Sequence, residues 1–407
     1  MSRNFKIRYS SLIISMTCAL IIITSPYIGQ RYNNILKLIL EIGIFISLLS
    51  QGVNNIKYIM YIGAFSFFSC LSTYFYYGLS VRLLNAIITV GAYICFFCSF
   101  SLYSKKYSFD HVFDVVKKNI IIYMLILDFF VLITFGKGLG GKSISGETIQ
   151  EAVYLLGNKF MVSYLHMMVL AFIPFSKHVQ KSKRKKIIRV LMFGVYSMFI
   201  CKLCDTTTGI VGCLTVAVLI TLFILGKHIV KVLANPKFVV AFFIISNGGF
   251  LLTDVVFNNM NLSSFLLSKS HTSTILSGRV TMYKICMDAI ASNPIWGYGI
   301  NYDIVQTTLS FGNPQNGILK MLLDSGIVGT VSFILVLYTM IPKNKSFFTE
   351  RQFALIAFIY AMLLCSLVEI NISAIFMLSC ALLSSSKSAK ENEEVKYVKR
   401  LSKRYLA

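Results

Sequence analysis

The longest polar interval of the chain, roughly residues 254–316, holds an arginine whose position in a helix favours an anionic ligand. Ser277 is a typical helix-capping residue and Asn293-Pro294 stops a helix, so the spacing predicts a helix that starts near Arg279. Arg279 would then lie in the first turn, where the helix dipole disfavours a cation. An anionic partner would compensate for that placement.

Two amide side chains, Gln315 and Asn316, lie at the end of the same interval. An amide offers both a donor and an acceptor, so these side chains can bond a sugar hydroxyl or a phosphate oxygen. The alternative is that they cap the helix expected to follow. The residue types alone leave both interpretations open.

The helix that carries Arg279 is expected to be amphipathic. Apolar residues recur three and four positions apart, while Lys284 and Asp288 form a polar part of the surface. Such a helix lies on a membrane surface or packs against other helices. Its apolar stripe comprises Met282, Ile285, Cys286, Ala289 and Ile290.

Composition predicts an integral membrane protein. Hydrophobic residues make up 56% of the chain and charged residues only 14%, against about 25% charged residues in soluble globular proteins. The formal net charge is +23, but the basic residues cluster in short linkers between apolar segments. This is the pattern of cytoplasmic loops in membrane proteins, and it argues against nucleic acid as a partner.

The apolar segments predict an all-α fold, a polytopic transmembrane helix bundle with about twelve spans and one long extracytoplasmic loop. Each segment is close to the ~20 residues that cross a bilayer as a helix. The last two are short and nearly continuous, so eleven spans remain an alternative. The expected spans are 11–29, 35–51, 58–77, 83–103, 119–135, 160–175, 187–201, 209–226, 238–253, 317–340, 353–369 and 371–386.

The distribution of lysine and arginine predicts the orientation. With the N-terminus inside, 28 basic residues fall on the inner side and ten on the outer side. Both termini are therefore expected in the cytoplasm, with the long polar interval outside the cell membrane. The expected parts are a bundle of about nine spans (1–253) with an extracytoplasmic loop near 136–159, a large extracytoplasmic loop (254–316), further spans (317–386) and a cytoplasmic tail (387–407).

The ten cysteines do not predict a metal site or a disulfide framework. Cys95 and Cys98, and likewise Cys201 and Cys204, have C-x-x-C spacing, but no second pair or histidine completes a zinc-binding set. Most of the cysteines fall in apolar segments, where they are expected to pack as small hydrophobic residues. No cofactor is expected.

Four short motifs follow one another in the late part of the chain. They are Ser277-Gly278-Arg279, then Asn-Pro-Ile-Trp-Gly-Tyr-Gly at 293–299, Pro-Gln-Asn-Gly-Ile-Leu at 314–319, and Asp-Ser-Gly-Ile-Val-Gly at 324–329. Their order and spacing resemble those of the O-antigen ligase and Wzy-type polysaccharide polymerase superfamily. The likeness is sharp over about residues 277–329 and diffuse elsewhere, where Asp205–Gly209 and Gly157–Phe160 also resemble family segments.

This resemblance implies transfer of a glycan from an undecaprenyl diphosphate carrier. The expected activity is that of a polysaccharide polymerase, a glycosyltransferase that joins lipid-linked oligosaccharide repeat units on the outer face of the cell membrane during capsule or O-antigen synthesis. The implied partners are the lipid-linked oligosaccharide, membrane lipid and other capsule assembly proteins. Because the diphosphate is the leaving group, cations that bind it are expected to matter most.

Five basic residues on the expected outer side could bind such a diphosphate. The planar fork of arginine suits phosphate oxygens especially well. The alternatives are arginine side chains that reach lipid phosphate and lysines in solvated loops. The candidates are Arg279, Arg82, Arg31, Lys142 and Lys159.

The sequence departs from the family pattern at one position. Many members have His-Asn where this chain has Gln315-Asn316, and an amide cannot act as a base because it does not titrate. His271 lies in the same interval and could substitute as a catalytic base, although a lone loop histidine is usually a bystander. The candidate catalytic residues are therefore Arg279, Gln315, Asn316 and His271.

A transporter, such as a flippase for lipid-linked oligosaccharides, is the main alternative. Asp128 lies in the middle of an apolar span and would be a proton site under that hypothesis. Carriers usually show internal repeats and broken helices, whereas this chain shows one long late loop and no repeat. The enzyme hypothesis is therefore favoured. A ligase of the same superfamily remains a second alternative.

Overall fold

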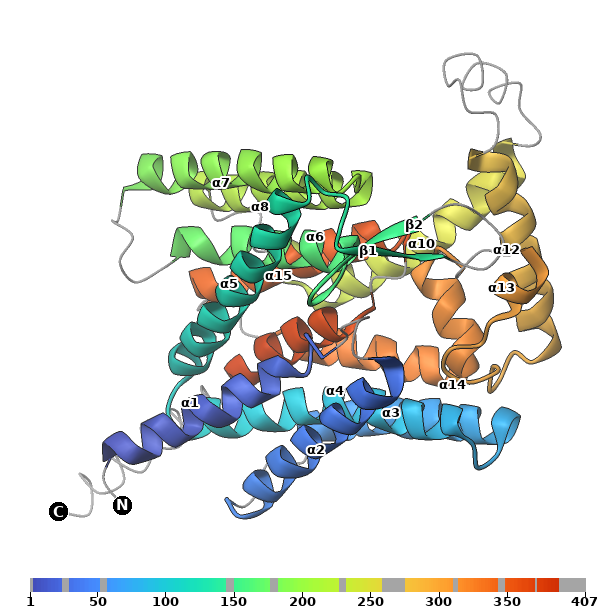
Figure 1. The fold of residues 1–407 in the computed structure, drawn as a ribbon, viewed down its shortest axis with the longest axis horizontal. Coiled ribbons are helices and arrows are strands. Elements are labelled where there is room, and N and C mark those ends of the chain that lie inside the picture. The colour runs from blue at the N-terminus through green and yellow to red at the C-terminus, as the bar shows by residue number, and fades with distance from the viewer. Residues whose placement is uncertain are drawn as a thin grey trace.

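The computed structural model describes most of the chain, and helices make up nearly all of it (Figure 1). The described residues are 3–23, 29–51, 57–143, 150–175, 182–226, 232–257, 275–309, 314–342, 348–369 and 372–387.

The helices pack side by side around a buried centre. Their bounds are α1 (Arg3–Ala19), α2 (Gly29–Leu49), α3 (Lys57–Tyr77), α4 (Val81–Lys106), α5 (Phe109–Ile133), α6 (Lys159–Phe172), the 3-10 turn η1 (Ile173–Phe175), α7 (Lys183–Leu203), α8 (Thr207–Leu225), α10 (Pro236–Phe257), α12 (Ile275–Ser292), α13 (Ile304–Leu309), α14 (Gly317–Met340) and α15 (Glu350–Cys365), with a further apolar helix at Ala374–Lys387.

A helix overlaps each of the twelve expected spans, although α1 begins at Arg3 and ends at Ala19, so it covers only part of the first expected span (11–29). Within the described part of the chain, five helices are long and apolar enough to cross a membrane by length and composition. They support a polytopic helical membrane protein, while the number of twelve crossings stays a prediction. The five are α2, α4, α8, α14 and the Ile59–Tyr77 part of α3.

The centre of the molecule is formed by helices that are apolar on all sides. In α15 nearly every residue is buried, and α6 is buried from Val162 to Phe172. A helix that is hydrophobic all round has no face to offer to water, so it lies inside a bundle. α6 and α15 pack against each other and against α8.

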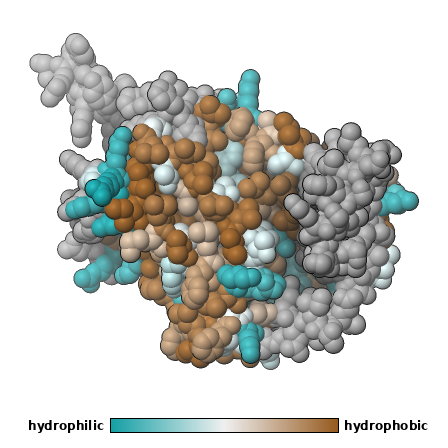
Figure 2. Space-filling model, turned by 90° about the horizontal axis from the view of Figure 1, so that it is seen from above, coloured by the Kyte–Doolittle hydropathy of each residue, from teal (hydrophilic) through white to brown (hydrophobic). Residues whose placement is uncertain are grey.

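The outer surface carries many exposed large hydrophobic side chains. Examples are Ile39 on α2, Phe129 on α5, Met192 on α7 and Leu214 on α8. Figure 2 shows broad areas of apolar residues on one face, with the hydrophilic residues mostly toward its margins. An apolar surface of this extent is expected where a protein faces lipid.

The segment between α5 and α6 is a small antiparallel sheet instead of a plain loop. Its strands are β1 (Gly140–Ser143), β2 (Gln150–Tyr154) and β3 (Gly157–Asn158), with β2 in the middle. The Tyr154 hydroxyl donates to the Gly136 carbonyl at 2.7 Å and fixes the sheet to the end of α5. The helical fold expected from the sequence omits this sheet, because glycine-rich strands this short carry no hydrophobic alternation.

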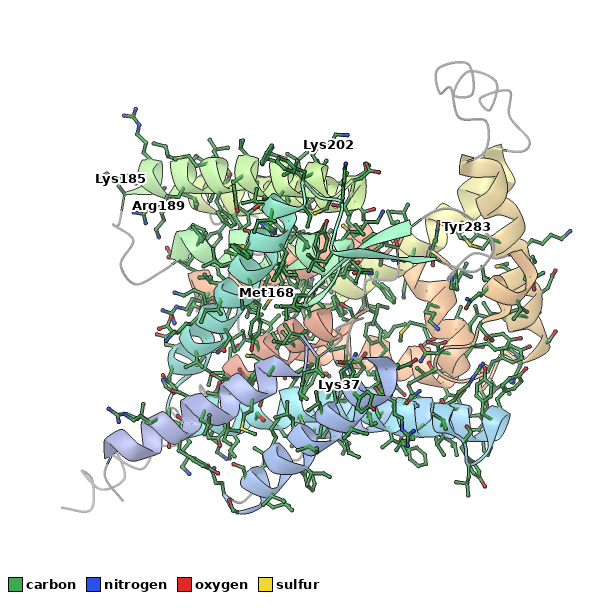
Figure 3. All side chains as sticks on the ribbon, in the orientation of Figure 1. Lys37, Met168, Lys185, Arg189, Lys202 and Tyr283 are labelled. Carbon is green, nitrogen blue, oxygen red and sulfur yellow. The ribbon has the colours of Figure 1, made fainter. Side chains whose placement is uncertain are left out.

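Different elements lie at the two ends of the bundle. The start of α1 lies at one end, and Lys185 and Arg189 of α7 lie at the same end in Figure 3. α12 and α13 lie at the opposite end, beyond α14 (Figure 1). The basic start of α7 and the start of α1 thus share one side of the bundle, as the orientation argument requires. Which side faces the cytoplasm stays a prediction.

Candidate functional site

The segment that follows α12 docks into a break in α14. Gly326 has φ +62° and ψ −165°, so the helix is interrupted at this residue and resumes after it. Residues 293–300, which we call the docked turn, bind the backbone groups that the break sets free. Two of the sequence motifs are therefore the two halves of one structural unit.

Four backbone hydrogen bonds hold the docked turn to α14. Such bonds matter most in an apolar surrounding, where an unpaired backbone group is costly. The amides of Tyr298 and Gly299 donate to the carbonyls of Leu323 and Asp324 at 2.6 and 2.9 Å, and the amides of Ile327 and Val328 donate to the carbonyls of Pro294 and Ile295 at 2.9 and 3.3 Å.

The glycines of both motifs permit this close approach. A Cβ on Gly326 would lie 2.1 Å from the Ile295 carbonyl oxygen, and one on Gly297 would lie 2.6 Å from the Leu323 carbonyl oxygen. Both glycines also have positive φ, which L-residues adopt only at a cost. The sequence alone suggests helix packing as the role of Gly326. The structure shows that it breaks the helix.

The end of α3 forms the third side of this unit. The Ser72 hydroxyl donates to the Asp324 carbonyl at 2.8 Å, and the Ile300 amide donates to the Thr73 hydroxyl at 3.0 Å. A Cβ on Gly299 would lie 2.6 Å from the Cα of Thr73. The docked turn therefore fits between two helices that are more than 200 residues apart in sequence.

The expected apolar stripe of α12 packs against the first half of α14. Met282, Cys286 and Ala289 are buried in one cluster with Leu319 and Leu323. This contact confirms the expected amphipathic helix and shows that it packs on the bundle.

A half-buried ion pair on α14 supports the docked turn. Lys320 Nζ lies 2.5 Å from Asp324 Oδ1, one helical turn further along α14. The Asp324 carboxylate also accepts hydrogen bonds from the backbone amides of Asn301 and Tyr302. It thereby fixes the chain just after the docked turn, where Asn301 has φ +66°.

Arg82, at the start of α4, pairs with a carboxylate that the sequence does not single out. Its Nη2 lies 3.2 Å from Asp303 Oδ2, and its Nη1 donates to the Tyr77 hydroxyl. The guanidinium also lies 4.4 Å from the centre of the Tyr77 ring. The side chains of Arg82 and Asp303 are 41% and 38% exposed, so this pair remains accessible.

Four tyrosines form a cluster that contacts this ion pair through Tyr77. The Tyr76 ring lies 4.8, 5.2 and 5.5 Å from the rings of Tyr77, Tyr298 and Tyr302, and Tyr298 stacks on Tyr302 at 4.2 Å. Burial raises the pKa of the Tyr302 hydroxyl, with a further contribution from Tyr76, so it stays protonated. Two rings come from α3 and two from the segment after α12.

Asn316 is the N-cap of α14. Its Oδ1 accepts from the amides of Ile318 and Leu319 at 3.0 and 3.1 Å, and its Nδ2 donates to the Leu367 carbonyl at 3.4 Å. The residue is 0% exposed. Gln315 beside it is partly exposed and has φ +48°. Of the two interpretations offered for these amides, the structure shows capping for Asn316.

The helix that carries Arg279 begins earlier than expected. α12 is described from Ile275, so Ser277 lies inside the helix and Arg279 follows its first turn. The argument from a cation in the first turn is therefore wrong, because the preceding hydrophobic residues extend the helix. The Arg279 side chain and the whole of His271 lie outside the described residues.

The other expected diphosphate-binding residues lie on separate elements. Arg31 is exposed near the start of α2, and Lys142 is on strand β1, with its side chain outside the described residues. Lys159 is the first residue of α6, and its Nζ lies 5.6 Å from the centre of the Phe160 ring. Among the candidates whose side chains are described, Arg82 alone is shown in contact with the segment after α12.

Asp128 has two partners that the sequence does not indicate. Its Oδ1 lies 3.3 Å from His166 Nε2 on α6, and its Oδ2 accepts from the Tyr196 hydroxyl of α7 at 2.6 Å. His166 is fully buried, and its Nδ1 lies 2.9 Å from the Val162 carbonyl oxygen. We call these three residues the buried triad.

A family model described as O-Antigen ligase matches residues 191–334 of the chain, about a third of its length. The matched residues run from within α7 to within α14 and include α12, the docked turn and the break at Gly326. No curated protein matches the chain. The family match confirms the resemblance found in the sequence motifs, and over these residues the chain is similar to the O-antigen ligase family.

Proposed function

We propose that the protein is a polysaccharide polymerase that joins undecaprenyl-diphosphate-linked oligosaccharide repeat units on the outer face of the cell membrane. The product would be a capsular polysaccharide or an O-antigen. One observation carries the proposal: the family match covers both the docked turn and the break in α14 that binds it.

The proposed reaction transfers a glycan between two lipid carriers. A hydroxyl of one carrier-linked glycan attacks the anomeric carbon of the other and forms a new C–O bond. The bond from that carbon to the diphosphate breaks, and the carrier diphosphate leaves with the electron pair. The hydroxyl proton passes to a base or to water. Cations on the diphosphate oxygens stabilise the charge that develops on the leaving group.

We assign the diphosphate first to Arg279, which lies near the start of α12, the helix that leads into the docked turn. Arg31, Lys142 and Lys159 are further candidates because each is basic and on the expected outer side. His271 is the candidate base. Gln315 and Asn316 would act by positioning the start of α14, since Asn316 is buried as its N-cap.

Deletion of the gene from its host, followed by analysis of lipid-linked glycans, tests this function. Loss of a polymerase leaves single repeat units on the carrier, at the outer face, without polymer. Single units trapped at the inner face would contradict the proposal and indicate a flippase. Accumulation of full-length polymer on the carrier would contradict it as well and indicate a ligase.

Arg279→Ala tests the diphosphate role within that experiment. We expect the variant to insert into the membrane normally and to make no polymer, because the leaving group loses its cation. Lys284→Ala is the matched control, since Lys284 is an exposed cation on the same helix. Full-length polymer in the Arg279 variant, at normal protein levels, would remove Arg279 from the mechanism.

A transporter is the second candidate, and one observation favours it. Broken helices are typical of secondary carriers, and α14 is broken at Gly326. In this chain, however, the docked turn fills the break and pairs its backbone groups. The Leu323 and Asp324 carbonyls at the break are already paired with the docked turn, so the polymerase remains the better supported function.

A further inference from the structure

The patch around Arg82 combines the chemical groups that a sugar-binding site needs. Tyr76 offers an aromatic side chain on a residue that is 47% exposed, and Asn301 is an exposed residue next to Tyr302 in the chain that follows the docked turn. Arg82 and Asp303 add a guanidinium and a carboxylate, each more than a third exposed. A pyranose ring has apolar C–H faces that pack on aromatic rings and hydroxyls that bond both donors and acceptors.

We propose that Tyr76, Arg82, Asn301 and Asp303 bind a sugar ring of the lipid-linked oligosaccharide. This inference deepens the proposed function, on which it rests for the source of the glycan. The sugar would pack on Tyr76 and hydrogen-bond through its hydroxyls to the other three side chains. The site would thus hold the glycan, while other cations bind the diphosphate.

The ion pair argues for a sugar over the diphosphate as the occupant. The positive charge of Arg82 is compensated by Asp303 at 3.2 Å, and a diphosphate would be repelled by that carboxylate. A sugar hydroxyl can donate to Asp303 and accept from Arg82 at the same time. The pairing therefore favours sugar binding by Arg82, whereas the other basic residues remain candidates for binding the diphosphate.

The surrounding contacts hold the site in a fixed shape. The Asp324 carboxylate accepts from the backbone amides of Asn301 and Tyr302, and Asn301 is held at φ +66°. Asn tolerates this backbone conformation, although it is uncommon for a residue with a Cβ. A rigid support of this kind reduces the entropy lost when a ligand binds.

An aromatic belt at the membrane interface is the competing explanation for exposed tyrosines. Belt residues need only reach the headgroup region. Here the Tyr76 ring instead contacts two rings from a segment more than 200 residues later, beside a paired arginine and aspartate. Tyr74 shows the difference, because it is 46% exposed on the same helix and its ring contacts Phe75.

The single tryptophan of the chain gives a direct assay. Trp296 lies in the docked turn, 5.3 Å from Phe75 between the centres of the rings, and it is the only tryptophan in the sequence. The probe is oligosaccharide released from the host's own polymer by mild hydrolysis. Binding to the purified full-length protein in detergent is followed by the change in tryptophan fluorescence.

We expect saturable binding by the wild type and an increase in Kd of about tenfold for Tyr76→Ala, the equivalent of one aromatic packing contact. Tyr76→Phe keeps the ring and should bind nearly as the wild type does. Asp303→Asn should weaken binding by a similar factor, while Tyr74→Ala should not. Inorganic diphosphate should not compete with the oligosaccharide.

Two results would overturn the site: equal affinity for Tyr76→Ala and Tyr74→Ala, or displacement of the oligosaccharide by inorganic diphosphate. An unchanged emission maximum in each free variant shows that the docked turn is intact. Failure of the proposed function is a separate outcome. If deletion of the gene leaves no single repeat units at the outer face, the function is wrong even where binding depends on Tyr76.

Discussion

Two groups of polar residues occupy different settings in this bundle. The buried triad of Asp128, His166 and Tyr196 joins α5, α6 and α7 inside the core. The Arg82–Asp303 pair joins α4 to the segment after α12 and is partly exposed at the end of the bundle. A buried polar group that satisfies itself stabilises one arrangement of helices, whereas an accessible pair can exchange its partners for a ligand. We therefore expect substitutions to separate stability from activity.

Gly326→Ala should have the largest effect, because it disrupts the docked turn, which supports the partly exposed Arg82–Asp303 pair. A Cβ at this position would lie 2.1 Å from the Ile295 carbonyl oxygen, and the residue has positive φ. The strain should exceed about 3 kcal/mol and release the docked turn. Polymer formation should be lost, measured as surface polysaccharide per inserted protein.

Gly63→Ala on α3 is the matched control for that variant. Among the described residues, a Cβ at Gly63 meets no heavy atom within 4 Å. Its polymer yield should equal that of the wild type. Polymer at normal levels in Gly326→Ala would contradict the importance of the break.

Asp128→Ala should mainly lower stability. It leaves the buried His166 and the half-buried Tyr196 hydroxyl without their partner, which costs about 3 kcal/mol. A thermal unfolding assay of the detergent-solubilised protein should show a clear decrease in Tm. Polymer formed per folded molecule should change little. A selective loss of activity at unchanged Tm would instead give the triad a functional role.

Asp324→Asn should have an intermediate effect and should lower both stability and activity. It weakens the contact with Lys320 and the hydrogen bonds from Asn301 and Tyr302, which should cost about 1–2 kcal/mol. Activity should fall about tenfold, because the sugar site loses its support. Asp288→Asn on the exposed face of α12 is the control. Equal activity of Asp324→Asn and Asp288→Asn would contradict the proposal that the contacts of Asp324 support activity.

Gln315→Ala should have the smallest effect. An amide cannot serve as a base, and the α14 cap is supplied by Asn316 beside it. Activity should decrease by no more than about threefold, since at most one ordinary hydrogen bond is lost. The initial rate of polymer formation measures this. Complete loss of polymer would give Gln315 a direct part in the reaction.

The helices were predictable from the sequence, and the contacts between them were not. Each apolar segment is a local signal, so a helix overlaps each of the twelve expected spans. The break at Gly326 depends on the docked turn about 30 residues earlier, and glycine alone also fits helix packing. Asp303 gave no signal at all, because its partner Arg82 lies 221 residues away.

The order of the sequence motifs indicated which segments make up the candidate site. The sequence motifs placed Arg279, the docked turn and the first half of α14 in one group, and the structure brings the docked turn into direct contact with α14 around the break at Gly326. It did not reveal the tyrosines of α3, which carry no motif. It also did not reveal that Arg82, a candidate for the diphosphate, has a carboxylate partner, since a partner so distant in sequence cannot be seen from one segment alone.

Reconstitution tests the polymerase proposal most directly. The purified protein in liposomes is given lipid-linked single repeat units, without nucleotide sugars or other enzymes, and the glycans on the carrier are separated by size. The proposal predicts a ladder of multiples of the repeat unit, with one free undecaprenyl diphosphate for each bond formed. Single units that stay single, with or without movement across the bilayer, would contradict it.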